Sequence, residues 1–173
     1  MGTNQRSQIV MTDDEIADFV RRNRTATMAT VGRDGQPHLV AMWYGLLESP
    51  DGGPVPEVWF ETKAKSQKAV NLRRNPRITV LIEDGLTYDT LRGVAIEGFA
   101  TIYDDEEHCL AAGISVWERY NGPYTDDLRP AVDAMMHKRV AVRVVPERLR
   151  SWDHRKLNLP EMPLAGSTSP FYT

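Results

Sequence analysis

The chain contains 173 residues, of which 41% are hydrophobic and 26% are charged. This length and balance are typical of one globular domain, and they exclude a disordered or collagen-like chain. The 21 Lys and Arg residues against 24 Asp and Glu residues leave a formal net charge of −3, which disfavours a generally basic nucleic-acid-binding protein.

The distribution of reactive and apolar residues points to a reducing compartment. Cys109 is the single cysteine, so an internal disulfide bond is excluded. No stretch approaches the roughly 18 consecutive apolar residues of a membrane-spanning helix, and the first ten residues lack the apolar core of a signal peptide. We therefore expect a cytoplasmic protein with no membrane partner. The histidines show no metal-site spacing, so we expect no metal; they are His38, His108, His137 and His154.

Capping and turn signals organise the first half of the chain. Residues 1–11 are polar and expected to be flexible. Thr12 and Glu15 form a capping box, which predicts a helix that ends near Asn23. Runs rich in β-branched and aromatic residues, separated by Gly, Asp and Pro, then predict three strands. These strands span residues 25–31, 37–46 and 57–62.

The second half repeats the pattern of helices between strands. Helices are expected at 65–75, from a capping box at Asp104 and Glu107 to Asn121, and at 126–138. Three further strands are expected at 77–83, 93–103 and 139–145, and Gly98 allows a bend in the second of them. The tail at 160–173 is rich in Pro, Gly, Ser and Thr and is expected to be irregular.

These elements predict a mainly β fold, a six-stranded antiparallel barrel with peripheral helices. No crossover helix falls among the first three strands, so a βαβ fold is disfavoured. A single domain is expected over residues 12–159. In the strand at 37–46, alternate residues are apolar on both faces, which predicts that both faces are covered.

The segment from Thr62 to Lys68 carries the clearest functional signal. It joins a strand to a helix, and Ser66 is a suitable N-cap. A helix N-terminus offers backbone N–H groups and a partial positive charge, which suit a phosphate. Thr62 adds a hydroxyl group, and six basic residues but no acidic residue lie between Lys63 and Arg77. A solvated basic helix face is the alternative interpretation.

Two segments together resemble a known family. The residues ATVGRDGQPHLVAMWY at 29–44 and AKSQKAVNLRRNPRITVLIEDG at 64–85 resemble the pyridoxamine 5′-phosphate oxidase-like split-barrel flavoproteins. The closer similarity is to their actinobacterial branch, class B, whose usual cofactor is the deazaflavin coenzyme F420. The resemblance covers roughly Thr12 to Arg155.

The resemblance implies a homodimer of split β-barrels with the cofactor at the subunit interface. The cofactor phosphate would bind to a segment at the end of one strand, and the ring system would lie along the second strand. The connection at 86–92 and the C-terminal segment would border the same groove. The implied cofactor-binding residues are Val40, Ala41, Met42, Trp43, Thr62, Lys63, Lys65, Ser66, Gln67, Lys68, Tyr88, Arg92 and Trp152.

The implied function is an F420-dependent oxidoreductase that transfers a hydride between the reduced coenzyme and an unsaturated small organic acceptor. Such a coenzyme carries the hydride itself, and no catalytic nucleophile–base pair stands out in the sequence. The basic run, which includes Arg73, Arg74 and Arg77, is expected to help hold the anionic coenzyme tail. Gln67 stands where the oxidase itself has a basic residue, which disfavours pyridoxamine phosphate oxidation.

Three alternatives remain open at this point. One is an FMN-binding split-barrel flavin reductase or oxidase, which shares the phosphate segment. Another is a carrier that binds F420 without turnover. The third is a nucleic-acid- or anion-binding barrel that uses the basic run, which the net negative charge disfavours.

Overall fold

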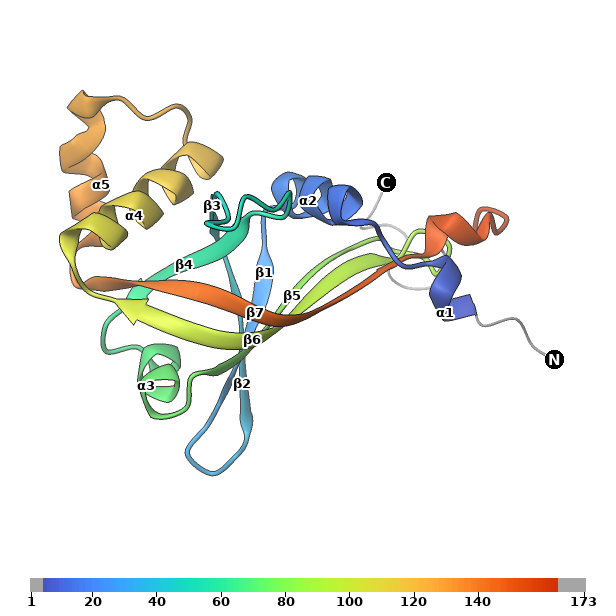
Figure 1. The fold of residues 1–173 in the computed structure, drawn as a ribbon, viewed down its shortest axis with the longest axis horizontal. Helices are drawn as coiled ribbons and strands as arrows, with labels where there is room; N and C mark the ends of the chain where they lie inside the picture. Colours follow the sequence, from blue (N-terminus) through green and yellow to red (C-terminus); the bar gives the residue numbers. More distant parts are fainter. Residues whose placement is uncertain (1–4, 165–173) are drawn as a thin grey trace.

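A curled antiparallel sheet of seven strands forms the centre of the molecule (Figure 1). The computed structural model describes residues 5–164. The strands are β1 (Ala26–Val31), β2 (Pro37–Met42), β3 (Gly45–Leu47), β4 (Glu57–Lys63), β5 (Arg77–Asp84), β6 (Arg92–Tyr103) and β7 (Arg139–Asp153). Their order across the sheet is β2-β1-β5-β6-β7-β4-β3, and all pairs are antiparallel. The expected mainly β split barrel is confirmed, with seven strands instead of six.

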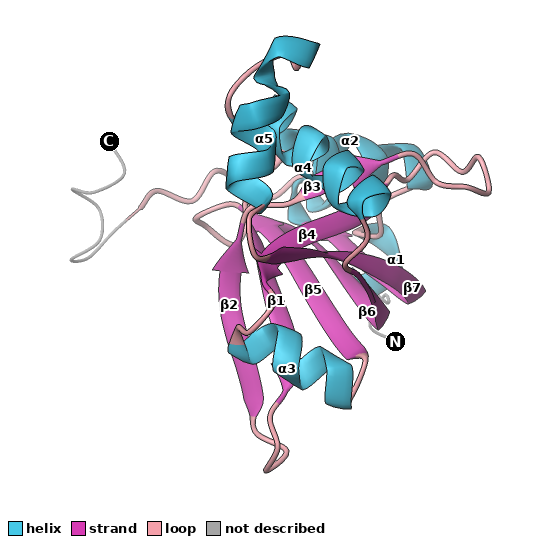
Figure 2. Ribbon diagram, turned by 90° about the vertical axis from the view of Figure 1, so that its left-hand side faces the viewer, coloured by secondary structure: helices cyan, strands magenta, loops and turns pink. Residues whose placement is uncertain are grey.

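Five α-helices surround the sheet. They are α1 (Gln5–Gln8), α2 (Asp13–Arg22), α3 (Gln67–Arg74), α4 (Glu106–Tyr120) and α5 (Arg129–Met136). Figure 2 shows α2, α4 and α5 gathered at one end of the sheet, whereas α3 lies apart from them near the β1–β2 hairpin. The helices are therefore peripheral, as the sequence predicts.

The capping box that predicts α2 is confirmed. The backbone N–H of Thr12 donates to Glu15 Oε2 at 2.7 Å, and the N–H of Glu15 donates back to Thr12 Oγ1 at 3.3 Å. The helix then buries Ile16, Phe19 and Val20 in the main core. Burying apolar side chains of this size contributes about 1.5–3 kcal/mol each. The cap starts the helix, and this burial holds it on the sheet.

The strand expected at 37–46 is interrupted. β2 ends at Met42 and β3 begins at Gly45, so the two residues between them leave the sheet. The backbone of Tyr44 bonds instead to side chains of α4: its N–H donates to Tyr120 Oη at 3.0 Å, and its carbonyl accepts from Arg119 Nε at 2.9 Å. The local pattern predicts one continuous strand because the contact that interrupts it comes from a residue 75 positions further along the chain.

The last strand is longer than expected. The sequence predicts its end at 145, but β7 continues through Pro146 to Asp153. The β6–β7 register shifts at Gly98, which pairs with Pro146 while Glu97 pairs with Arg148. This β-bulge absorbs the proline, which has no N–H to donate. A Cβ at Gly98 would lie 2.1 Å from the carbonyl oxygen of Val145, so the predicted bend needs glycine.

Several helix boundaries also differ from the expectation. The N-cap of α4 is Asp105, whose side chain accepts from His108 N–H at 3.0 Å, so a capping box from Asp104 is wrong. The helix expected at 126–138 is a 3₁₀ turn at Asp126–Leu128 followed by α5. The helix expected at 65–75 is the shorter α3.

The two ends of the described chain lie against each other. Within the segment expected to be flexible, α1 is helical, and the Asp153 N–H donates to the carbonyl of Ile9 at 2.7 Å. The N–H of Met11 donates to Ser151 Oγ at 3.0 Å. Residues 158–164 of the chain's end have no regular structure, and the rest of the expected irregular tail, 165–173, lies outside the described residues.

Candidate functional site

The end of β4 and the start of α3 form a polar junction. Thr62 is buried, and its Oγ1 lies 3.1 Å from Ser66 Oγ. Ser66 Oγ accepts from the N–H of Ala69 at 3.3 Å, which confirms Ser66 as the N-cap. The first N–H groups of a helix have no partners within it. The junction therefore presents hydroxyl and amide groups together.

Strand pairing adds a second basic segment to this junction. Lys63 lies opposite Arg139 in the β4–β7 ladder. Lys63 Nζ donates to the carbonyl of His137 at 3.2 Å, and the Ala64 N–H donates to the carbonyl of Lys138 at 2.9 Å. Residues 137–139 were not predicted as site residues. The sequence predicts a strand at 139–145, but it does not predict that this strand pairs with β4 and so brings residues 137–139 to the junction.

The junction carries an excess of positive charge. Arg139 Nη1 pairs with Glu61 Oε2 at 2.5 Å, while the buried Nε of Arg139 has no hydrogen-bond partner. Burial lowers the pKa of Lys68, the charge of Arg139 lowers it further, and Glu61 only partly opposes the two. A bound anion would relieve the repulsion between Lys68 and Arg139, so this position is suited to a phosphate.

The six basic residues from 63 to 77 divide into two groups. Arg73 and Arg74 donate to the carbonyls of Ala64 and Val31, both at 2.5 Å. Arg77 pairs with Glu147 at 2.9 Å. Lys63 likewise donates to a carbonyl, whereas within residues 5–164 no hydrogen bond or ion pair involves the side chains of Lys65 and Lys68. The lysines at the start of α3 are thus more available to a ligand than the arginines at its end.

An open groove of about 640 Å³ lies between α3 and the β1–β2 hairpin. Gln67 and Asn71 line one wall, and His38 lines the other. Gln67 Nε2 donates to Asn71 Oδ1 at 2.8 Å, and the buried Nδ1 of His38 has no hydrogen-bond partner. The groove connects the start of α3 to β2.

The two faces of β2 differ within one chain. Val40 and Met42 pack against the main core. On the other face Ala41 is exposed, Leu39 is 63% exposed and Trp43 is 56% exposed. The expectation that both faces are covered is therefore wrong for a single chain. An exposed apolar strand at a sheet edge is normally covered by a ligand or by another chain.

The remaining predicted residues are Tyr88 in the β5–β6 connection, Arg92 at the start of β6 and Trp152 near the end of β7. Figure 1 shows these segments at the end of the sheet that lies away from α3. β5 runs from the end of α3 to Asp84, which pairs with Arg92 across the β5–β6 ladder. Seven residue steps in an antiparallel strand span about 24 Å. Within one chain, the structure does not bring this group next to the start of α3.

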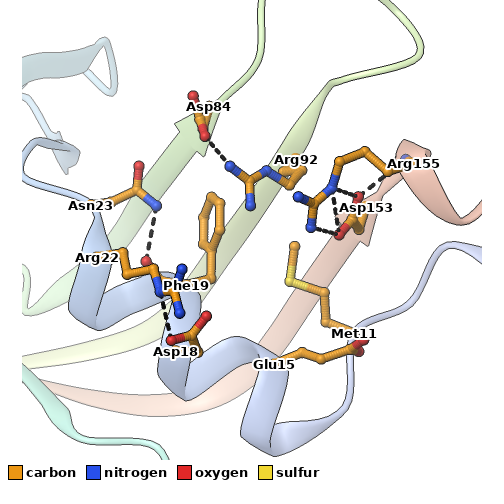
Figure 3. A pocket seen from close by; sticks show the side chains of 10 residues that line it. All are labelled: Met11, Glu15, Asp18, Phe19, Arg22, Asn23, Asp84, Arg92, Asp153 and Arg155. Atoms are coloured by element: carbon orange, nitrogen blue, oxygen red, sulfur yellow. Dashed lines mark hydrogen bonds and ion pairs between the residues drawn. The ribbon is translucent and has the colours of Figure 1, made fainter.

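Arg92 lines a separate cavity of about 220 Å³, drawn in Figure 3. The charged side chains there lie in opposite pairs. Arg92 pairs with Asp84, and its guanidinium lies over the Phe19 ring at 5.2 Å. Arg155 Nη2 pairs with the buried Asp153 at 2.5 Å. The remaining lining pairs are Arg22 with Asp18 at 2.7 Å and Glu15 with Lys156 at 2.5 Å.

Tyr88 and Trp152 have structural contacts at the same end. The Nδ1 of His154 lies 2.7 Å from the carbonyl oxygen of Tyr88, and their rings are 4.5 Å apart. Trp152 lies opposite Gly93, where a Cβ would meet its ring at 2.2 Å. The indole therefore covers the glycine directly.

Two further findings concern the described part of the chain as a whole. Residues 5–164 contain no group of three or more His, Cys, Asp or Glu side chains arranged to hold a metal ion. The helices in this range are also too short or too polar to cross a membrane.

Comparison with known proteins identifies the family. A model of the family described as pyridoxamine 5′-phosphate oxidase matches residues 12–153. The chain belongs to this family. Comparison with curated proteins gives no match.

Solved structures of this family's fold resemble the chain to different degrees. The conserved hypothetical protein Rv2991 from Mycobacterium tuberculosis is 62% identical, with a TM-score of 0.88 over 96% of this chain and 99% of that one. An F420 reductase is 26% identical, with a TM-score of 0.55 over 77% of this chain and 94% of that one. HutZ, a heme storage protein from Vibrio cholerae, is 18% identical, with a TM-score of 0.60 over 80% and 92%, and shares the fold alone.

Proposed function

We propose that this protein is an F420-dependent oxidoreductase that reduces an unsaturated small organic molecule. The observation that carries the proposal is the excess positive charge at the start of α3, where Lys68 and Arg139 repel each other. This position adjoins β2, whose outer face is apolar and exposed. An anion site beside an apolar strand suits a ligand with a phosphate and a planar ring.

The spacing of the two parts supports this interpretation. Gln67, at the start of α3, shares a groove with Pro37, which lies on the same face of β2 as Leu39 and Ala41. Six residue steps of a strand, about 20 Å, separate Pro37 from Trp43. A phosphate near Lys68 and a ring along β2 therefore lie within the reach of one extended cofactor.

Coenzyme F420 is favoured over FMN by two observations. Lys63, Lys65 and Lys138 add more positive charge than a single phosphate requires, which suits a coenzyme with a polyanionic tail. An F420 reductase is also among the similar structures. The bound coenzyme would supply the hydride, while this chain would bind its anionic groups and orient its ring. The tail would lie near these lysines, because the arginines at the end of α3 bond within the chain.

A homodimer would complete the site. The outer face of the sheet carries two rows of mostly small or apolar residues, which suit contact with a second copy. One row is Thr27, Leu81 and Ala95, and the other is Ala29 and Thr79; both lie beside β2 and leave its outer face to the coenzyme ring. Tyr88 and Arg92 lie too far from α3 of their own chain, so they would border the cofactor only across such an interface. Sedimentation that gives a monomer mass at micromolar concentration would contradict this arrangement.

The test is a titration of the purified protein with coenzyme F420 and, in parallel, with FMN, followed by ring fluorescence. We expect tighter binding of F420, and we expect Lys68→Ala to weaken it roughly tenfold to a hundredfold, as for loss of a charge-assisted hydrogen bond. The control Arg129→Ala removes a positive charge from α5, away from α3, and should bind like the wild type.

The outcomes separate the candidate functions. Preference for FMN would replace the reaction with flavin chemistry at the same phosphate site. Tight F420 binding without reduction of any acceptor in a broad panel would indicate a carrier. Steeply salt-dependent binding to oligonucleotides, with neither cofactor bound, would indicate a nucleic-acid-binding protein. We expect the active protein in the cytoplasm, where Cys109 stays reduced.

A further inference from the structure

Trp43 is held in a stack although much of it is exposed. It directly follows β2, and its ring lies 4.4 Å from the ring of Tyr120, the last residue of α4, at an interplanar angle of 5°. More than half of the Trp43 side chain is nevertheless exposed. One face of the indole thus rests on Tyr120, and much of the rest is available to a ligand.

The backbone beside Trp43 is fixed by side chains of α4. Tyr120 Oη donates to the carbonyl of Arg24 at 2.6 Å and accepts from the Tyr44 N–H at 3.0 Å. The Arg119 guanidinium donates to the carbonyls of Tyr44 at 2.9 Å and Asn23 at 2.6 Å. These bonds tie the end of α4 to the interruption between β2 and β3 and to the end of α2. The orientation of the indole is therefore preorganised before any ligand binds.

The surface next to the indole is exposed and apolar, with a small residue at its centre. Leu39 and Ala41 lie on the same exposed face of β2 because alternate residues of a strand share a face, and Trp43, the first residue after the strand, is exposed beside them. Four residue steps place Leu39 and Trp43 about 14 Å apart, with only a methyl group between them at Ala41. The small side chain of Ala41 forms a floor beside the indole. A planar ring system can rest on this floor with its face or edge against the indole.

We propose that Tyr120 is a positioning residue, which holds the Trp43 indole as a stacking platform for a planar conjugated ring. The inference deepens the proposed function, because the ring would belong to the proposed coenzyme or to its acceptor. The contribution of Tyr120 acts through Trp43, since the Tyr120 ring stacks on the indole and its hydroxyl fixes the adjoining peptide. The sequence analysis did not single out Tyr120 or Arg119.

The experiment uses the whole protein labelled with 6-fluorotryptophan and lumichrome as the probe. Lumichrome is a planar tricyclic compound without a phosphate, so it tests the platform separately from the anion site. The chain has four tryptophans, and Trp43→Phe assigns the resonance of Trp43 in the ¹⁹F spectrum. We expect lumichrome to shift that resonance and to leave the resonance of the buried Trp59 unchanged.

Three variants separate stacking from general structural effects. Tyr120→Leu removes the stack and should weaken lumichrome binding about threefold to tenfold, the range typical of an aromatic pair. Tyr120→Phe retains the ring but loses the hydroxyl bonds, so it should keep the fold, broaden the Trp43 resonance and weaken binding less. Tyr103→Phe is the matched control, because Tyr103 stacks on His108 elsewhere, and it should bind like the wild type.

The source of the ring is distinguished by adding lumichrome to protein saturated with F420. Competition would assign the platform to the coenzyme ring, and simultaneous binding would assign it to the acceptor. An unchanged Trp43 resonance at saturating lumichrome, or wild-type affinity in both Tyr120 variants, would overturn the proposal. A Trp43 resonance that shifts on dilution without ligand would overturn it too, because a second copy would then cover the indole.

The inference and the proposed function can fail separately. Lys68→Ala should lose affinity for F420 but keep the lumichrome response, because Lys68 lies at the anion site. A lumichrome response in a protein that does not bind F420 would leave the platform in place and contradict the proposed coenzyme.

Discussion

Around the cavity of Figure 3, every charged lining residue has a partner of opposite sign, whereas cations predominate at the start of α3. The first region joins α2 to the ends of β5, β6 and β7. The second joins two segments, 63–68 and 137–139, whose positive charges repel one another. Charges that are neutralised within the chain stabilise its fold. Positive charges that are not neutralised repel one another and lower the stability of the fold, and a bound anion would relieve this repulsion.

The largest expected effect is on stability, from removing the buried member of a pair. Asp153→Ala leaves the Arg155 guanidinium without its carboxylate and should lower the free energy of unfolding by about 2–3 kcal/mol. Urea denaturation would measure the loss. A variant as stable as the wild type would show that this ion pair does not stabilise the fold.

The exposed pair in the same cavity provides the matched control. Arg22 and Asp18 form an i,i+4 pair on α2, and both side chains are mostly exposed. Asp18→Ala should change the free energy of unfolding by no more than about 0.5 kcal/mol, because exposed pairs contribute little. An effect as large as that of Asp153→Ala would contradict the role given to burial.

At the start of α3, removing a charge should act in the opposite direction. The lowered pKa of Lys68 means that the folded chain holds its proton less tightly than the unfolded chain does. Lys68→Met should therefore raise the melting temperature slightly while it weakens F420 binding about tenfold to a hundredfold. Differential scanning fluorimetry and the fluorescence titration give the two readouts. A loss of both stability and affinity would contradict the comparison between the regions.

Acid should weaken the paired region. Burial raises the pKa of Asp153, but hydrogen bonds from Arg155 outweigh burial and hold the pKa below its usual value. A lowered pKa stabilises the fold above the ordinary carboxyl pKa of about 4, and this contribution is lost as the pH falls through the folded-state value. Free energies of unfolding measured between pH 6 and pH 3 should decline in this window. Asp153→Asn should flatten the decline.

Local signals predicted much of the fold. The capping box of Thr12 and Glu15 and the N-cap at Ser66 depend on neighbours within a few residues. The strand patterns correctly indicated a mainly β protein. The predicted ends of strands were wrong where contacts with distant residues determine them, as at the interruption between β2 and β3.

The sequence predicted only one part of the candidate site. The segment from Thr62 to Lys68 stands out because its hydroxyl and basic residues are contiguous. Arg139 and Tyr120 do not, because each joins the site through a pairing of segments far apart in the chain. Arg73 and Arg74 look equally basic in the sequence, yet carbonyl groups of the folded chain occupy their guanidinium groups.

Residues close to one another are sufficient to indicate the caps of α2 and α3, the stretches that form strands and the places where cations gather along the chain. The fold as a whole sets which charges are neutralised, which face of β2 stays exposed and how Trp43 is oriented. Those outcomes depend on the pairing of β4 with β7 and on the packing of α4 against the interruption after β2. Such long-range contacts have no signature in a local pattern, since they exist only once the chain has folded.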